Sequence, residues 1–147
     1  RNNFIINLDA LNFQNFVGLT NLTIKGKALQ SVIKSINCKL VAFDWCLAKL
    51  LVLKNKKGIF KKNIYTYYRQ HNKNISGIKN FSKKILLNDI KNKTEHLVYF
   101  KKFGLPYKNE IKRLKKMNLQ LRKRNNLYKT IKKKLSKTRK EYWWSHI

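Results

Sequence analysis

The sequence predicts an α-rich α+β fold with a small N-terminal core and a long basic C-terminal helix. Apolar residues make up 43% of the 147 residues and aromatic residues 12%, which is more than a disordered chain usually contains. The net charge of +29 makes the chain repel itself, so we expect its folded state to depend on an anionic partner. The charge is also uneven, because residues 1–53 carry +4 and residues 54–147 carry +25. The core is therefore expected in the first third of the chain.

Changes in charge and residue type divide the chain into three parts. Residues 1–53 are expected to form the small α+β core, and residues 54–105 a basic, aromatic-rich region of helices and loops. Residues 106–147 are expected to form a long basic helical extension. A length of 147 residues fits one domain with such an extension.

Short apolar patterns follow one another in the first part. Phe4–Leu8 is predicted as a strand because it is apolar and rich in β-formers. Asp9 is a suitable N-cap for a short helix through Phe16. Leu22–Ile24 suits a second strand or an extended lead-in, and Ala28–Ile36 has the apolar spacing of an amphipathic helix.

The run from Cys38 to Leu53 is open to two interpretations. Leu40–Phe43 is either a buried strand followed by a helix from Asp44, or the whole run is one buried helix. We prefer the strand and helix, because Asp is a favourable N-cap.

The middle part begins with a basic turn at Lys54–Gly58. Ile78–Ile90 has helical apolar spacing, and Thr94–Phe103 is predicted as a separate short element. The Gly-Leu-Pro sequence at residues 104–106 is expected to end it.

The last part lacks Gly and Pro from Glu110 onward and predicts one uninterrupted helix over residues 107–142. Such a helix would be about 50 Å long. A narrow apolar stripe recurs every seven residues, and 14 Lys or Arg residues against two acids surround it in residues 110–147. The stripe consists of Leu114, Leu121, Tyr128, Leu135 and Tyr142.

The basic residues of the middle part and of the extension are the predicted binding residues. Solubility alone needs far less charge on a chain of this size, so we expect them to contact phosphates. They are Lys54, Lys56, Lys57, Lys61, Lys62, Arg69, Lys112, Arg113, Lys115, Lys116, Arg122, Lys123, Arg124, Lys129, Lys132, Lys133, Lys134, Lys137, Arg139 and Lys140.

Aromatic residues lie among these cations at two places. Tyr65, Tyr67 and Tyr68 either stack on unpaired RNA bases or pack against protein. Trp143 and Trp144 are open to the same two interpretations, and for them we favour packing at an interface, which buried aromatic residues commonly anchor.

The sequence offers little for catalysis or for a cofactor. Its six acids are scattered and its three histidines lack metal-ligand spacing, so we expect no enzyme, metal site, cofactor or small-molecule substrate. Cys38 and Cys46 are interpreted as free thiols of the core, rather than zinc ligands or a disulfide. The longest apolar run, Leu40–Leu53, is too short to span a membrane.

The overall make-up resembles that of ribosomal proteins, which combine a small core with a long basic extension. Lys (29), Asn (18) and Ile (14) dominate and share A/T-rich codons, which indicates an AT-rich genome, either organellar or nuclear. With this bias the chain resembles a mitochondrial ribosomal protein encoded by an organellar genome. The resemblance implies rRNA and neighbouring ribosomal proteins as partners, in the mitochondrial matrix.

A local similarity covers residues 15–50. Asn15–Thr20, the helical pattern to Ile36, and then Leu40–Phe43 and Leu47–Leu50 resemble the N-terminal domain of the large-subunit stalk-base ribosomal protein. That family has the same order of Gly-Leu-Thr, helix, apolar strand and Leu-Ala-rich helix. The rest of the chain departs from it, because the family's C-terminal helices carry apolar faces, whereas this extension is basic.

We therefore expect a structural function, in which the chain binds and stabilises rRNA of an organellar ribosome through contacts of Lys and Arg with phosphates. One alternative is an accessory basic subunit of an organellar membrane or respiratory assembly, with its basic surface on anionic lipid. The other is a free-standing RNA- or DNA-binding protein.

Overall fold

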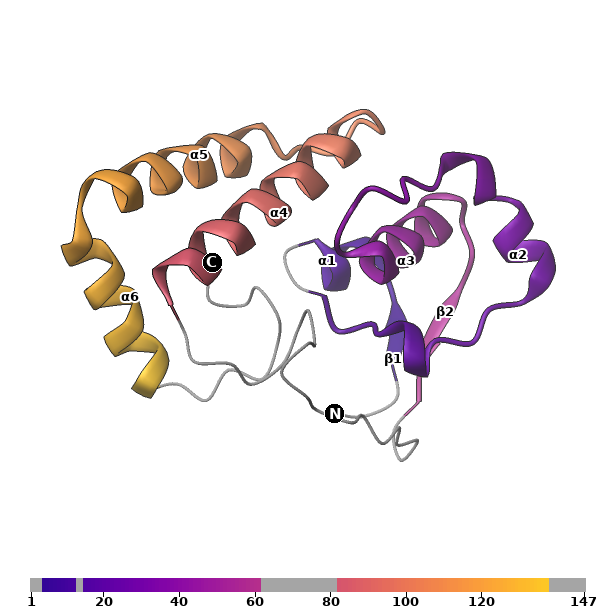
Figure 1. Cartoon of the computed structure of the whole chain (residues 1–147). Coiled ribbons are helices and arrows are strands. Elements are labelled where there is room, and N and C mark those ends of the chain that lie inside the picture. The colour runs from indigo at the N-terminus through magenta and orange to yellow at the C-terminus, as the bar shows by residue number, and fades with distance from the viewer. Residues whose placement is uncertain (1–3, 13–14, 62–81, 138–147) are drawn as a thin grey trace. The chain divides into compact units, whose positions relative to one another are not determined.

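The computed structural model describes residues 4–12, 15–61 and 82–137, with the backbone alone at residues 125 and 134–137. The chain forms two compact units, Arg1–Asn74 and Ile75–Ile147. Helices dominate both units, and the strands of the described residues form one two-stranded sheet (Figure 1). The predicted α-rich α+β fold with a basic helical C-terminal region is confirmed, but the core is not confined to the first third of the chain, because the C-terminal unit buries apolar residues of its own.

Helix α3 (Phe43–Leu53) is the centre of the N-terminal unit. Its apolar side chains point in most directions around the axis and are buried from Trp45 to Leu51, as expected for a helix that neighbours surround. Helix α1 (Leu8–Leu11) packs on it. The indole Nε1–H of Trp45 donates a hydrogen bond of 2.6 Å to the carbonyl oxygen of Leu11.

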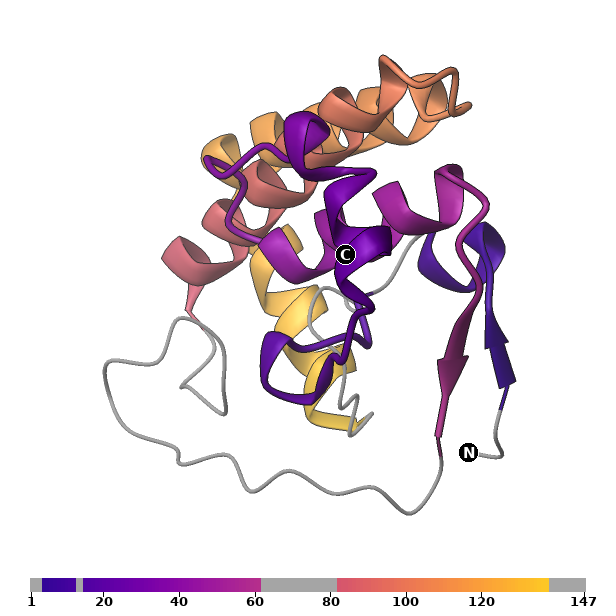
Figure 2. The ribbon, with the colours of Figure 1, turned by 90° about the vertical axis from the view of Figure 1, so that its right-hand side faces the viewer.

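A short antiparallel sheet brings the two ends of this unit together (Figure 2). Strand β1 (Phe4–Ile6) pairs with β2 (Gly58–Phe60), and the rings of Phe4 and Phe60 stack with centroids 5.0 Å apart. The strand predicted at Phe4–Leu8 is present over Phe4–Ile6, whereas Leu8 begins α1. Of the two alternatives for Leu22–Ile24, the strand is wrong and the extended lead-in fits, because Leu22 is extended after the 3₁₀ turn Leu19–Asn21 and the segment leads into the next helix without forming a strand.

Side-chain capping explains why the first helix differs from its prediction. The Oδ1 of Asn7 accepts a hydrogen bond from the backbone N–H of Ala10 at 2.8 Å, so Asn7 is the N-cap. Asp9 therefore lies inside the first turn, where a carboxylate is also favourable. The helix ends at Leu11 and does not reach Phe16.

The amphipathic helix predicted at Ala28–Ile36 is also shorter than expected. Helix α2 spans Gly26–Gln30, and a separate 3₁₀ turn follows at Ile33–Ser35. The hydroxyl of Ser31 donates to the carbonyl oxygen of Ala28 at 2.6 Å, a local bond of the kind that competes with helix continuation.

The preferred interpretation of residues 40–53 is half right. The strand at Leu40–Phe43 is wrong, whereas the helix expected from Asp44 is present and begins one residue earlier. The carboxylate of Asp44 accepts hydrogen bonds from the N–H of Trp45 at 2.7 Å and from the side-chain amide of Asn15 at 2.8 Å. Burial nevertheless raises the pKa of Asp44.

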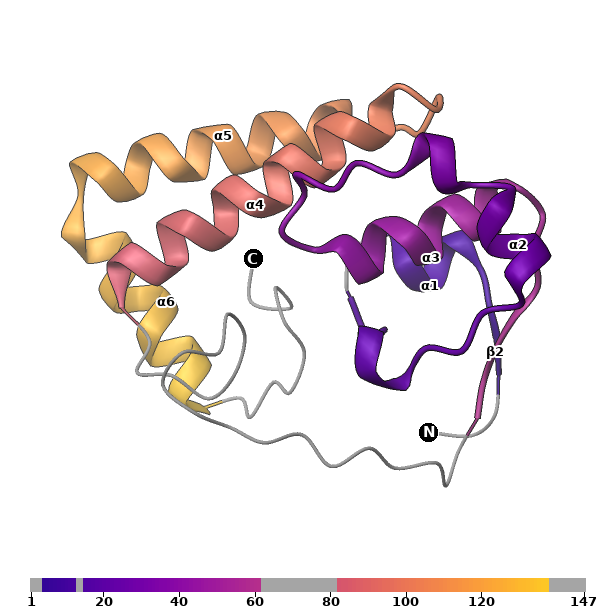
Figure 3. The same ribbon diagram turned by 45° about the vertical axis from the view of Figure 1, so that its right-hand side comes forward.

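The described residues of the C-terminal unit, 82–137, form a helical hairpin followed by a third helix (Figure 3). Helices α4 (Lys83–Lys101) and α5 (Lys108–Lys123) run antiparallel and pack along their lengths, and α6 (Asn125–Lys137) follows α5. The buried apolar residues of the hairpin are Leu86, Ile90, Leu97, Phe100, Tyr107, Ile111, Leu114 and Leu121.

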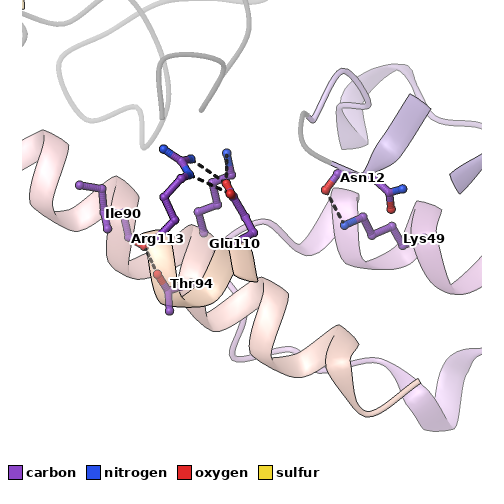
Figure 4. Close-up of polar contacts among 7 residues, drawn as sticks. Asn12, Lys49, Ile90, Thr94, Glu110 and Arg113 are labelled. Atoms are coloured by element: carbon purple, nitrogen blue, oxygen red, sulfur yellow. Dashed lines mark hydrogen bonds and ion pairs between the residues drawn. The ribbon is translucent and has the colours of Figure 1, made fainter. Parts of the chain in front are cut away.

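Helix α4 replaces two predicted elements, the first of which begins at residues 78–81, outside the described residues. It begins after Ser82, whose hydroxyl oxygen accepts from the N–H of Ile85 at 3.2 Å, and it runs through Thr94 without interruption. The hydroxyl of Thr94 donates to the carbonyl oxygen of Ile90 at 2.7 Å (Figure 4). Thr94 therefore satisfies its polar group within the helix and does not start a new one.

The predicted stop before the extension is confirmed, but the single long helix is divided. Gly104 has a φ of +79°, a left-handed conformation that favours glycine, and it ends the first arm of the hairpin. Arg124 is extended, with φ −131° and ψ 119°, and it separates α5 from α6. Up to Lys137 the extension is thus two helices of 16 and 13 residues, and residues 138–142 of the predicted helix lie outside the described residues.

Replacing Gly104 by Ala is expected to destabilise the C-terminal unit by about 1 kcal/mol. An added Cβ would meet nothing within 4 Å, so the loss would come from the backbone conformation alone. Urea unfolding followed by circular dichroism measures it.

Gly26→Ala is the matched control, because Gly26 is helical and its added Cβ also meets nothing within 4 Å. This variant should be as stable as the wild type or slightly more stable. Equal destabilisation by both substitutions would contradict the prediction.

Candidate nucleic-acid interface

Helix α5 has a buried stripe and a basic face on opposite sides. The stripe predicted from the seven-residue repeat is buried at Leu114 and Leu121. Tyr128 of the repeat is half-buried, whereas the side chain of Leu135 and residue Tyr142 lie outside the described residues. The stripe faces α4, so the repeat marks the packing of a helical hairpin.

A cluster of charged side chains joins α4 to α5, in which Lys93 is buried, Glu110 is half-buried and Arg113 is exposed. The carboxylate of Glu110 accepts two hydrogen bonds from the guanidinium of Arg113, at 2.7 and 2.8 Å (Figure 4). The same carboxylate lies 3.9 Å from the ammonium of Lys93, whose side chain is 3% exposed. The hydrogen bond from Arg113 lowers the pKa of Glu110, which therefore stays ionised.

The ammonium of Lys93 loses hydration because it is buried. Burial lowers its pKa to about 8, although the Glu110 carboxylate acts in the opposite direction. Burial also raises the pKa of the neighbouring interface residue Tyr107 to about 12, so this phenol stays neutral. The interior of the hairpin is thus a poor place for charge, and α5 directs its other cations outward.

We define the basic face of α5 as Lys112, Lys116 and Lys123. Each lies two residues from a buried stripe residue, which is about 200° around the helix, so the three side chains point away from α4. All three are exposed. Leu119 shares this face and is 59% exposed. The predicted residues Arg113, Lys115, Arg122 and Arg124 are exposed beside it.

Helix α6 repeats the same arrangement. Lys129 and Lys133 each lie two residues from the half-buried Ile131 and are exposed, and Lys132 is exposed beside them. From residue 108 to residue 137 the sequence holds 13 Lys or Arg and one acid, Glu110. Because Glu110 pairs with Lys93 and Arg113, the outward surfaces of α5 and α6 are positive.

A second group of predicted residues lies in the N-terminal unit. Lys54, Lys56, Lys57 and Lys61 are exposed around the turn that leads into β2 and just after that strand. The predicted turn is present, and Asn55 adopts a φ of +55° in it. Strand β2 is not predicted by the sequence, and it places part of the middle region in the N-terminal unit.

The remaining predicted residues lie at the edge of the described chain or beyond it. Lys134 and Lys137 belong to α6 by their backbone only. The others lie outside the described residues and are Lys62, Tyr65, Tyr67, Tyr68, Arg69, Arg139, Lys140, Trp143 and Trp144.

The turn between α4 and α5 carries basic residues that are absent from the predicted set. Lys101, Lys102 and Lys108 are exposed there, beside Phe103. The sequence holds a signal for them, because Tyr99-Phe100-Lys101-Lys102-Phe103 interleaves aromatic and basic residues in the way that singles out Tyr65–Arg69.

Both cysteines are free thiols, but only Cys46 lies in the core as predicted, and the core position predicted for Cys38 is wrong. Cys46 is buried in α3, and burial raises the pKa of its thiol, whereas Cys38 is exposed. Lys49 of the same helix is fully buried, with its ammonium 4.2 Å from the centroid of the Trp45 ring. It also donates a hydrogen bond of 3.3 Å to the carbonyl oxygen of Asn12 (Figure 4).

Within the described part of the chain, His, Cys, Asp and Glu do not gather in any group of three that could hold a metal ion. Among the same residues, no helix combines the length and the hydropathy needed to cross a bilayer. Comparisons with protein-family models, with curated proteins and with solved structures find no match to this chain.

The buried position of Lys93 predicts a pH dependence of stability. Its folded-state pKa of about 8 lies below the ordinary 10.5, so the unfolded chain binds more protons between these pH values. The unfolding free energy should therefore rise with pH across this window, by up to about 3 kcal/mol from this group. Lys93→Met should remove that rise. It should not weaken the fold at pH 7, because Glu110 keeps Arg113.

Urea unfolding at pH 7, 8, 9 and 10 measures the effect. Lys91→Met is the control, because Lys91 lies on the same helix but is exposed. It reports how stability changes as the surface lysines lose charge. A Lys93→Met variant with the pH dependence of the wild type would show that Lys93 is not responsible.

Proposed function

We propose that this chain is a structural constituent of a mitochondrial ribosome that binds and stabilises folded rRNA, and that it is not an enzyme. The observation that carries the proposal is the division of α5 and α6 into an inner apolar side and an outer side of exposed Lys and Arg. A polyanion with closely spaced phosphates is the ligand that this surface fits.

Like-charge spacing adds a second argument. Lys112 and Lys116 are four residues apart, as are Lys129 and Lys133, so each pair repels within its own helix by a few tenths of a kcal/mol. Phosphates along the helix would turn this repulsion into attraction. The arrangement therefore favours a chain that is stable when bound to a polyanion.

The part of the proposal that names a mitochondrial ribosome rests on the sequence alone. The Lys, Asn and Ile bias and the basic extension support a mitochondrial ribosomal protein in the matrix, with rRNA and neighbouring ribosomal proteins as partners. Sedimentation tests this part of the proposal. The chain should stay with a ribosomal subunit through moderate salt washing, and recovery with membranes would favour the membrane-assembly alternative.

Replacing Lys112, Lys116 and Lys123 together by Gln tests the binding of phosphates directly. RNA affinity should fall for all sequences alike, because phosphate contacts carry no sequence information. Each cation that leaves its phosphate should flatten the slope of log affinity against log salt by about 0.7–0.9 units, so the three together should flatten it by about 2 to 3 units. Fluorescence anisotropy with a duplex RNA over a salt series gives this slope.

Leu119→Gln is the matched control, because Leu119 lies on the same face and is exposed but uncharged. It should leave the salt slope unchanged. If the triple variant keeps the wild-type slope, α5 does not bind phosphates and the proposed function fails.

A further inference from the structure

We propose that the turn between α4 and α5 is a docking site for an unpaired RNA base, which stacks on the ring of Phe103. The inference rests on the proposed RNA-binding function and identifies the part of the RNA that this turn holds. Phe103 follows the last turn of α4 and is 39% exposed, whereas Phe100, one turn earlier, is fully buried.

The rings of Phe100 and Tyr99 hold the ring of Phe103 in place. Its centroid lies 5.7 Å from that of Phe100, which is fully buried, and 5.5 Å from that of Tyr99, at an interplanar angle of 62°. The backbone is fixed as well, because the N–H of Phe103 donates to the carbonyl oxygen of Phe100 at 3.0 Å. A ring that is already ordered loses little entropy when a base stacks on it.

Neighbouring rings are engaged within the protein. Lys102 places its ammonium 5.6 Å from the centroid of the Tyr99 ring, and Tyr99 also meets Phe100 edge-on, with centroids 5.2 Å apart. Tyr99 is half-buried and Phe100 is buried. Phe103 is therefore the ring of this cluster that offers its surface to a ligand.

The charge around the ring selects the kind of ligand. Lys101, Lys102 and Lys108 are exposed on the two sides of the turn, and residues 98–109 contain no acid. An apolar ring surrounded by cations fits a nucleotide, whose base stacks while its phosphate meets a Lys. Duplex RNA keeps its bases inside the helix, so the base must come from a bulge, a loop or a single strand.

The test compares two RNAs that differ only in an unpaired segment. One is a hairpin with a fully paired stem, and the other is the same hairpin with a three-adenosine bulge. The affinities of the full-length wild type, Phe103→Leu and Phe103→Tyr are measured by fluorescence anisotropy at one salt concentration. Thermal unfolding confirms that the variants are folded.

Phe103→Leu keeps an apolar side chain but removes the ring, so it should weaken binding of the bulged RNA about tenfold and leave the paired RNA unaffected. Phe103→Tyr should bind both RNAs as the wild type does. Val98→Ala is a further control, because Val98 is exposed and apolar on α4 but carries no ring. In a third hairpin, in which 5-iodouridine replaces one bulge adenosine, photo-crosslinking should modify Phe103.

The outcomes separate this inference from the function it rests on. If the wild type binds neither RNA, the proposed function fails. If it binds both and Phe103→Leu lowers the two affinities equally or not at all, the base-docking site is wrong and the phosphate surface of α5 stands.

Discussion

The carboxylate of Glu110 is the constraint on which the C-terminal unit depends. Packing α5 against α4 brings two lysine-rich helices together, and Glu110 places one negative charge where Lys93 would otherwise be a lone buried cation. The two hydrogen bonds from Arg113 hold that carboxylate in a fixed orientation. Because burial of the Lys93 ammonium costs hydration that a contact of 3.9 Å offsets only in part, the cluster acts mainly by fixing how the two helices meet.

The direction of Glu110, toward α4, also determines the charge of the outer side of α5. A carboxylate on the outer side of α5 would pair with Lys112 or Lys116 and weaken the field that these side chains create. With Glu110 turned toward α4, the exposed cations of α5 and α6 add to one another over the surface. The fold and the proposed binding surface therefore come from the same distribution of charge.

The sequence predicts the features of the fold that depend on residue spacing along a helix or on the conformation of a glycine. The buried stripe at Leu114 and Leu121 and the stop at Gly104 follow from spacing and from glycine chemistry. Strand β2 could not be predicted, because its three residues lie between lysines and show no alternation of apolar and polar side chains. Only their pairing with β1 makes them a strand. The burial of Lys93 is equally hidden, since it depends on a carboxylate on another helix. On the candidate surface, the sequence predicts which residues are basic, whereas their exposure and direction depend on the hairpin.

The division of the extension at Arg124 changes how it meets a curved partner. One straight helix from Lys108 to Lys137 would touch a rounded object along a single short line near its middle. Helices of about 24 and 20 Å with separate axes form an elbow instead (Figure 3), and each arm can lie along its own segment of the partner. The run Arg122-Lys123-Arg124 then sits at the vertex, where the two contact lines meet.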